Sequence, residues 1–240
     1  MQQEFHYAEW KVRSTRSNVV SKHMKLPSSI TATQRTLAAP IELPPPGSSP
    51  FRCKGLVYLG AKEFYAKKIP DPEGGAQWIA DGHLRAFWNQ HFLASTWVDA
   101  LPIVELSRAA ARVSNVPHNA LVRDNARFVA ERDIQGVYRL LLRVASAGMV
   151  AARLPKAFLQ YFNFGKIGEQ TSESKSSEVV LSEIPEPLAG WLCVCFEGFI
   201  PTALTMSGAS DALVRCENLG IDGSKDRIPT CSLRIHMRWR

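Results

Sequence analysis

The sequence predicts an α+β fold in which helices come first and an antiparallel ββαββ unit follows. Apolar residues recur with helical spacing before residue 155, and short β-branched or alternating segments appear after it. A long apolar segment beginning near Pro185 separates two pairs of these segments. Because each pair can be joined by a hairpin, we expect an antiparallel sheet that carries the long apolar helix on one face.

Residues 1–50 predict a flexible leader rich in proline and serine, which ends in the run Pro-Pro-Pro-Gly-Ser-Ser-Pro. The leader shows no sustained apolar period, and a docking arm is the less favoured alternative to a linker. We therefore expect a single α+β domain over residues 51–240. Within it, residues 55–60 predict a short strand or turn that leads into residues 61–67.

Helical signals dominate the next segment. Asp81 is placed to cap one helix, Pro102 to begin another, and Pro117 to separate that helix from a further one over residues 119–132. The clearest helical spacing of apolar residues predicts one face of a buried helix. Its residues are Ile134, Val137, Tyr138, Leu141, Leu142 and Ala145.

The C-terminal third predicts the sheet. An aromatic cluster over residues 158–164 ends at a turn marked by Gly165 and Gly168, and residues 171–177 resemble a hairpin loop. Residues 178–183 predict a strand, and a helix is expected from Pro185 through Leu204. The last strand alternates strictly, which predicts one buried and one basic solvent face. Its apolar residues are Cys231, Leu233, Ile235, Met237 and Trp239.

Composition narrows the function classes. The net charge of +7 comes from interspersed residues of both signs, which does not favour nucleic-acid binding. The N-terminus lacks an apolar signal segment, and Glu197 and Pro201 interrupt the most apolar stretch, so we expect no membrane span and a cytoplasmic protein. Five cysteines without CxxC spacing predict reduced, buried thiols. They are Cys53, Cys193, Cys195, Cys216 and Cys231.

Several segments together resemble a family of uncharacterised proteins expanded in myxobacteria. The segments are Arg85–Phe87, His91–Pro102, Glu131–Arg139, Tyr161–Gly165 and Glu197–Pro201. The likeness covers about residues 52–240 and implies a cytoplasmic single-domain protein without an assigned activity. The order of helices followed by ββαββ also resembles, at the level of fold, the domain of haem nitric-oxide sensors, 4-vinyl reductases and vesicle-tethering TRAPP subunits. That analogy directs attention to a pocket between helices and sheet, although a fold does not determine a function.

Two sets of residues are candidates for a site. The first is aromatic and could line a ligand pocket between helix and sheet, although ordinary core packing explains the same residues. Its members are Phe158, Tyr161, Phe162, Phe164, Trp191 and Phe199. The second is a charged node that could be an anion or acid–base site, or a structural cap with arginine–carboxylate pairs, and the structural interpretation is favoured. Its members are Arg127, Glu131, Arg132, Asp133 and Arg139.

Haem bound as in the resembling sensors would need a proximal histidine on the helix before the sheet. No histidine occurs between His118 and His236, and the sensors' Tyr-x-Ser-x-Arg carboxylate clamp is absent. A cysteine ligand stays open as an alternative. Cys193 and Cys195 diverge on a helix, and His83 and His91 have no carboxylate at zincin spacing, so no metal site is expected. We name no catalytic residue and no cofactor.

These observations favour a non-enzymatic cytoplasmic module that binds a small apolar ligand or a protein partner, with a signalling or regulatory role. The first alternative is a scaffold that self-assembles as a homo-oligomer through the sheet edge ending at Trp239. A less favoured alternative is an enzyme with an acid–base site near Asp133.

Overall fold

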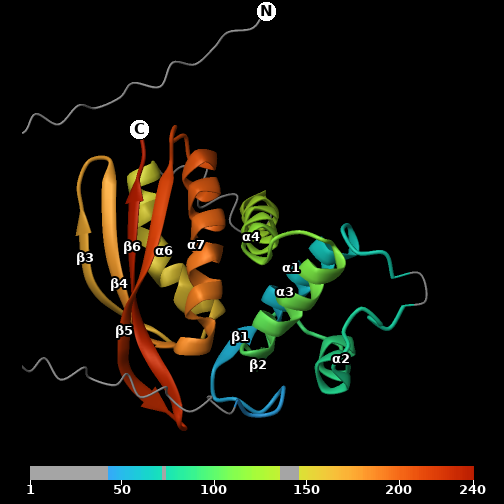
Figure 1. Cartoon of the computed structure of the whole chain (residues 1–240). Coiled ribbons are helices and arrows are strands. Elements are labelled where there is room, and N and C mark those ends of the chain that lie inside the picture. Colours follow the sequence, from blue (N-terminus) through green and yellow to red (C-terminus); the bar gives the residue numbers. More distant parts are fainter. Residues whose placement is uncertain (1–42, 72–73, 136–145) are drawn as a thin grey trace, which may run out of the picture. The chain divides into compact units, whose positions relative to one another are not determined.

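The computed structural model describes residues 43–71, 74–135 and 146–240, and it confirms the α+β class (Figure 1). By its contacts, Pro40–Arg240 forms one compact unit. The helices described are α1 (Gly55–Ala66), α2 (Gly82–Asn89), α3 (Pro102–Val113), α4 (His118–Gln135), α6 (Ala147–Tyr161) and α7 (Glu186–Met206). The strands are β1 (Arg52–Lys54), β2 (Trp97–Asp99), β3 (Lys166–Ser172), β4 (Ser176–Pro185), β5 (Leu213–Lys225) and β6 (Ile228–Arg238).

The four C-terminal strands form an antiparallel sheet in the order β3-β4-β6-β5, with α7 connecting β4 to β5. Strand β4 pairs with β6 through the register Val179 opposite Ile235, and β5 pairs with β6 through Cys216 opposite the same residue. The expected ββαββ order is therefore confirmed. Strands β1 and β2 form a separate antiparallel pair that the sequence did not predict.

One face of the four-stranded sheet is apolar and the other is polar, as the alternation of β6 predicts. Leu233, Ile235 and Met237 are at most 3% exposed. On the opposite face, carboxylate oxygens of Glu178 of β4 lie 3.2 Å from Nε of Arg234 and 2.8 Å from Nδ1 of His236, both on β6. Helices α6 and α7 lie against the sheet, and their side chains share one cavity with residues of its apolar face (Figure 1).

We expected a free edge of the sheet at Trp239, and this expectation is wrong. Trp239 follows β6, which is an interior strand, and its side chain is buried at 6% exposure. The outer strands of the sheet are β3 and β5. Self-assembly through the end of β6 would consequently require a core side chain to leave the core.

Helix α7 confirms the helix expected from Pro185 through Leu204, and it ends two residues later at Met206, with Pro201 inside it. Its length and apolar composition would allow it to cross a membrane, but half of the apolar window is buried inside the protein. A helix that is apolar on all sides is expected at the centre of a fold. Here α7 contacts the sheet on one side and α4 on another.

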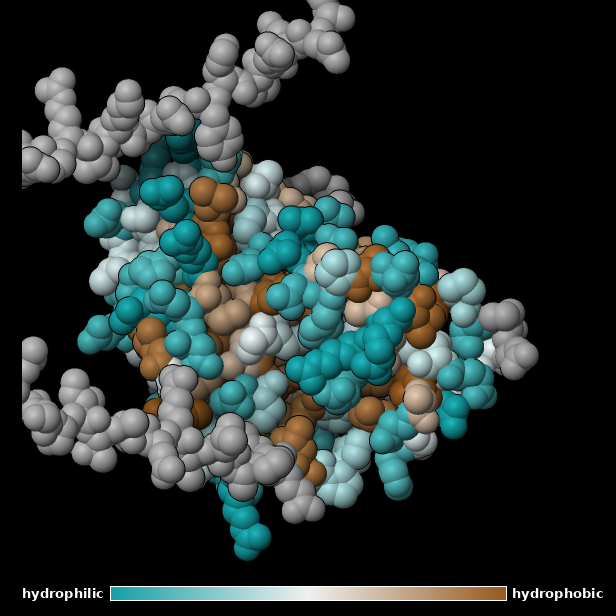
Figure 2. Space-filling view, viewed as in Figure 1, coloured by the Kyte–Doolittle hydropathy of each residue, from teal (hydrophilic) through white to brown (hydrophobic). Residues whose placement is uncertain are grey.

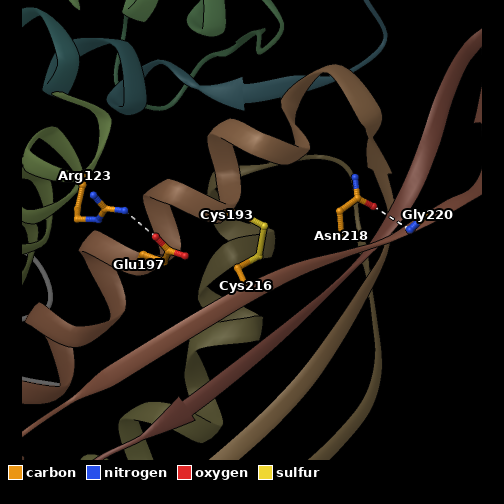
Figure 3. The surroundings of a disulfide bond; sticks show 6 residues. All are labelled: Arg123, Cys193, Glu197, Cys216, Asn218 and Gly220. Carbon is orange, nitrogen blue, oxygen red and sulfur yellow. Dashed lines mark hydrogen bonds and ion pairs between the residues drawn. A yellow bond between two sulfur atoms is a disulfide. The ribbon is translucent and has the colours of Figure 1, made fainter. Parts of the chain in front are cut away.

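The contact between α4 and α7 depends on a glycine. A Cβ atom at Gly198 would lie 2.5 Å from the carbonyl oxygen of Arg123 and 3.0 Å from Cβ of Ala126. One residue earlier, Glu197 accepts a hydrogen bond from Arg123 at 2.8 Å (Figure 3). The two helices therefore approach as closely as backbone atoms allow, with an ion pair at the rim.

Residues before the expected boundary at Phe51 form hydrogen bonds with the domain. The backbone N–H groups of Gly47 and Ser49 donate to the carboxylate of Asp99 at 2.9 and 3.0 Å, and the Ser49 hydroxyl also donates to it. Ser49 and Asp99 are at most 1% exposed. The end of the proline-rich segment is thus bonded to β2.

Residues 55–60 belong to helix α1, so the expected strand or turn there is wrong. The first N–H groups of the helix donate to carbonyls of the 94–96 segment, Gly55 to Thr96 at 2.8 Å and Leu56 to Ala94 at 3.1 Å. This satisfies donors that a helix N-terminus leaves unpaired. The predicted caps are confirmed at Asp81, which accepts from Leu84, and at Pro102. The helix predicted from Ile134 to Ala145 falls almost wholly outside the described residues.

A disulfide joins Cys193 of α7 to Cys216 of β5 (Figure 3). The expectation that all five cysteines are reduced is therefore wrong for this pair, while Cys53, Cys195 and Cys231 are free. The divergence expected for Cys193 and Cys195 is confirmed, because one bonds to β5 and the other lines the cavity. The disulfide holds the central helix to an outer strand of the sheet.

We predict opposite effects for alanine at two glycines of α7. Gly198→Ala forces α4 and α7 apart and should lower the free energy of unfolding by about 1–3 kcal/mol. Gly190→Ala meets nothing within 4 Å and should raise it by about 0.5–1 kcal/mol through helix propensity. Urea denaturation of both variants provides the measurement. Equal effects at the two positions would show that the close contact is not what limits the packing.

We also predict the thiol count. Protein purified without reductant and unfolded in guanidinium should release three reactive thiols, and five after reduction, because only the pair Cys193–Cys216 is bonded. The Cys216→Ser variant should be less stable than the oxidised protein by about 2–4 kcal/mol, since the crosslink restricts the unfolded chain. Five thiols before reduction would contradict the disulfide.

Candidate functional site

The structure contains a cavity of about 140 Å³ between the apolar face of the sheet and the helices. Side chains from α1, α3, α4, α6, α7, β4 and β6 contribute to its wall. The sheet provides residues such as Val179 and Met237, and α7 provides Trp191, Phe196 and Phe199. On the surface in Figure 2, hydrophobic residues form separate patches among hydrophilic ones.

Most of the aromatic set predicted from the sequence lies in this wall. Phe158, Tyr161 and Phe162 come from α6 and the residue after it, and Trp191 and Phe199 come from α7. Phe164 does not line the cavity, because its ring packs edge-on against Phe51 and Phe158 at 5.6 and 6.0 Å. Phe164 is therefore a core residue in this structure. Whether the other five bind a ligand remains a prediction.

Few polar atoms reach the cavity. Its wall includes Asn125 of α4, the hydroxyl-bearing Tyr161 and the thiol of Cys195. Burial raises the pKa of the Cys195 thiol well above its usual value, so this group stays protonated. No Lys, Arg, His, Asp or Glu belongs to the wall as the described residues form it. The cavity is apolar with a few neutral polar groups.

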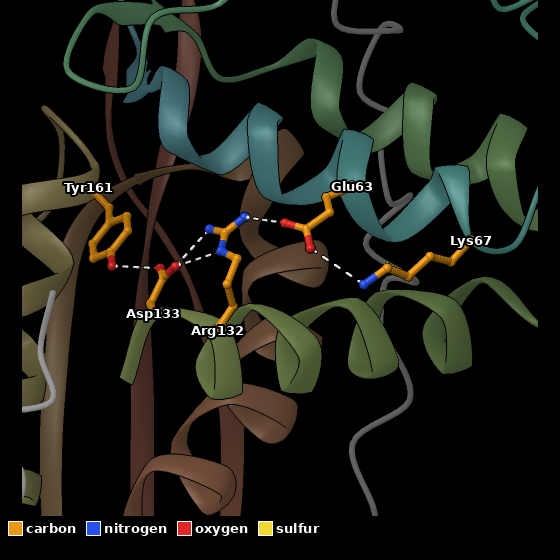
Figure 4. Close-up of polar contacts among 5 residues, drawn as sticks. All are labelled: Glu63, Lys67, Arg132, Asp133 and Tyr161. Atoms are coloured by element: carbon orange, nitrogen blue, oxygen red, sulfur yellow. Dashed lines mark hydrogen bonds and ion pairs between the residues drawn. The ribbon is translucent and has the colours of Figure 1, made fainter. Parts of the chain in front are cut away.

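Asp133 lies beside the cavity in a network that joins three helices (Figure 4). Its carboxylate accepts from Arg132 Nη2 at 2.7 Å and from Nε at 2.9 Å, and from the hydroxyl of Tyr161 at 2.9 Å. Arg132 also lies 3.5 Å from Glu63 of α1, which pairs with Lys67 at 3.4 Å. The network therefore ties α4 to α6 and to α1.

This geometry corrects the predicted charged node. Asp133 lies inside α4 rather than at an N-cap, and its arginine partner is Arg132. Arg127 pairs instead with Asp124 on the exposed surface, Glu131 is exposed, and Arg139 lies outside the described residues. The predicted arginine–carboxylate interaction occurs between Arg132 and Asp133, whereas the predicted N-cap role of Asp133 is wrong.

A serine–histidine pair also occurs, which the sequence analysis did not find. The Oγ atom of Ser107 and Nε2 of His118 are 2.8 Å apart, across the turn between α3 and α4. The Ser107 hydroxyl donates to the carbonyl of Val104 and therefore accepts from His118. Burial, and then the nearby Arg108, lower the pKa of His118. Because Ser107 is fully buried, the pair joins two helices and does not present a nucleophile.

No protein-family model matches the chain, and no curated protein matches it. Solved H-NOX domains share its fold. One is an oxygen-binding H-NOX domain related to soluble guanylate cyclases, with a TM-score of 0.52 and 9% identity, covering 78% of this chain and 92% of the other. Another is an Fe(II) unliganded H-NOX mutant from K. algicida, with a TM-score of 0.54, 9% identity and coverage of 78% and 96%. At this identity the likeness shows the fold alone, and the expected fold-level resemblance is confirmed.

We predict that Asp133 is structural. Asp133→Asn removes the charge that faces Arg132 and weakens the bond to Tyr161, so the free energy of unfolding should fall by about 1–3 kcal/mol. The matched control is Asp124→Asn, which breaks an exposed pair with Arg127 and should cost less than about 0.5 kcal/mol. Chemical denaturation of the two variants tests this. A loss at Asp133 no larger than at Asp124 would contradict the structural role.

Proposed function

We propose that this protein is a non-enzymatic binding module that holds one compact apolar ligand in the cavity between α6, α7 and the sheet. The observation that carries the proposal is the cavity itself, whose wall is made of aliphatic and aromatic side chains from seven elements. The cavity of about 140 Å³ is partly open and leaves apolar side chains without packing partners, so an apolar ligand that covers them is favoured. Bound ligand would restore the missing contacts.

The volume limits the ligand to about one ring. Typical sites for drug-sized molecules occupy about 300–1,000 Å³. An apolar cavity of about 150 Å³ stays dry and accepts a molecule the size of benzene. The cavity here is close to the second case, which favours a single aromatic ring or a short aliphatic chain.

Haem does not fit the residues present. The proteins of similar fold include haem and oxygen binders, but here α6 carries no histidine and the cavity is too small for a porphyrin. Of the residues in the described wall that can ligate haem iron, Tyr161 donates its hydroxyl to Asp133 and Cys195 remains a protonated thiol. The third is Met237, and a methionine ligates haem iron together with a histidine, which the described wall lacks. The wall also lacks a cation to pair with haem carboxylates.

The fold supports binding as the general role. A domain of the same fold is described as oxygen-binding, and in α+β folds a cavity between helices and sheet is a common place for a ligand. We extend the proposed binding role to regulation or signalling. The cavity wall includes residues of α1, α4 and α6, and the Asp133 network connects the same three helices, so a ligand in the cavity would contact helices that are linked to one another. A cytoplasmic location and a relationship to the myxobacterial family remain predictions.

The alternatives have weaker support. A self-assembling scaffold was expected to use a contact at Trp239, but this residue is buried. An acid–base site near Asp133 would need a free carboxylate, but this carboxylate accepts hydrogen bonds from Arg132 and Tyr161. Binding of a protein partner remains open, and no described surface identifies that partner.

We predict that benzene or toluene near saturation raises the melting temperature of the wild-type protein by several degrees, since ligand that binds only the folded state stabilises it. Phe199→Trp adds volume at the cavity wall and should abolish the shift. Differential scanning fluorimetry in sealed cells gives the measurement, and native mass spectrometry of freshly purified protein checks for a retained ligand.

The matched control is Phe128→Trp, which makes the same change on α4 at a residue outside the cavity wall. This variant should keep the full ligand-induced shift. Absence of any shift in the wild-type protein, with no retained ligand, would reject ligand binding and favour a protein partner. A native mass at a multiple of 26.7 kDa would favour the scaffold.

A further inference from the structure

Strand β5 is an outer strand of the four-stranded sheet, and no strand of the described residues pairs with its free side. Such an edge presents backbone N–H and C=O groups to any strand that can approach it. Leu213 and Ile221 of β5 are 61% and 64% exposed, the highest values among the large hydrophobic side chains of the described residues, and Leu219 is 42% exposed. Free backbone groups and exposed apolar side chains therefore occur together on this edge, which favours pairing with another strand.

The regular part of β5 carries one charge of each sign. From Leu213 to Asn218 the strand pairs with β6 in unbroken register, and the first bulge comes after Asn218. Arg215 and Glu217 lie in this part. Both are exposed, and neither forms an ion pair with a residue that the structure describes. Because side chains alternate along a strand, these two unpaired charges lie on the same face of the sheet.

A second copy of β5 can supply the opposite charge to both residues. Two copies of one strand pair antiparallel around a two-fold axis, and residues directly opposite each other point to the same face of the joined sheet. When the axis passes at Cys216, Arg215 of each copy lies opposite Glu217 of the other. In the same register Leu213 lies opposite Leu219 at both ends of the paired segment. Exposed charges and exposed leucines are thus matched at once.

The neighbouring registers are disfavoured. Moving the axis by one residue, to Arg215 or to Glu217, places that side chain opposite its own copy, and like charges directly opposite destabilise a pair of strands. Placing the axis between two residues would set the apolar face of one sheet beside the polar face of the other. Of these registers, the one centred on Cys216 alone satisfies both the charges and the faces.

We propose that the free edge of β5 binds β5 of a second copy of this chain, antiparallel and centred on Cys216, so that two four-stranded sheets join into one. The contact is isologous, because each copy contributes the same residues. The inference goes beyond the proposed function, since no residue of β5 belongs to the described cavity wall. It also differs from the contact first expected at Trp239, which is buried.

The first test is the mass of the protein in low salt, measured by sedimentation equilibrium over a series of concentrations. The wild-type protein should change reversibly from one chain to two. Arg215→Glu and Glu217→Arg each place like charges opposite each other twice in the dimer, so each should weaken it by at least about tenfold. A wild-type mass of one chain at every concentration would overturn the inference and leave the edge to a strand of another protein.

Mixing the two variants tests the register and shows that both are folded. In a mixed dimer the new glutamate at position 215 faces the new arginine at position 217, and the native Glu217 and Arg215 face each other at the second contact. We therefore expect mixed dimers at concentrations at which each variant alone is monomeric. Native mass spectrometry with one variant isotope-labelled detects them. Failure of the mixture to dimerise would overturn the register.

Glu169→Arg is the matched control. Glu169 is an exposed residue of β3, the other outer strand, and its substitution changes the net charge by the same amount as Glu217→Arg. The dissociation constant of the dimer should stay within about twofold of the wild-type value. A loss as large as that in Glu217→Arg would overturn the assignment to β5.

The benzene-induced rise in melting temperature separates this inference from the proposed function. A dimer that keeps the rise supports both and is a two-chain binding module. A dimer without the rise supports this interface, contradicts the proposed function and favours the scaffold. A rise in a protein that stays monomeric supports the proposed function and overturns this inference.

Discussion

The architecture depends on helix α7, which has no continuous polar face to expose to solvent. Along α7, apolar side chains and small residues point in all directions, and nine of its residues are buried. Such a helix is stable only when it is covered on several sides. The sheet covers one side, α4 covers another at the Gly198 contact, and the disulfide from Cys193 fixes the helix to β5.

The same constraint explains why a cavity forms where it does. At Gly198 the backbone of α4 is in direct contact with α7, whereas towards α6 the large rings of Trp191, Phe196 and Phe199 hold the elements apart. The polar network at Asp133 connects α4 to α6. Close packing at Gly198 and the bulky rings of Phe196 and Phe199 therefore occur within the same part of α7, and the cavity lies beside these rings.

The sequence predicted the elements with strong periods and missed the contacts between distant residues. The alternation around Leu233 identified β6, because one face of that strand is buried. The short apolar run at residues 55–60 was interpreted wrongly, since a buried helix and a buried strand cannot be distinguished over six residues. The Cys193–Cys216 bond leaves no local pattern in the sequence, because it depends on how α7 and β5 meet. Five of the six aromatic candidates reached the cavity wall because they lie on α6, directly after it, or on α7, and these helices face the sheet.

Proteins that share a fold can differ in what they bind, because binding depends on the side chains of a few cavity residues. The H-NOX domains and this chain have the same arrangement of helices and sheet, at only 9% identity. What binds in the space between depends on volume, on ligating atoms and on charge, and these differ with side chains that the fold does not constrain. In this chain burial keeps Cys195 a neutral thiol, and the Tyr161 hydroxyl donates to Asp133. No Lys, Arg, His, Asp or Glu belongs to the described wall, so its chemistry favours a neutral, largely apolar occupant over an ionic one.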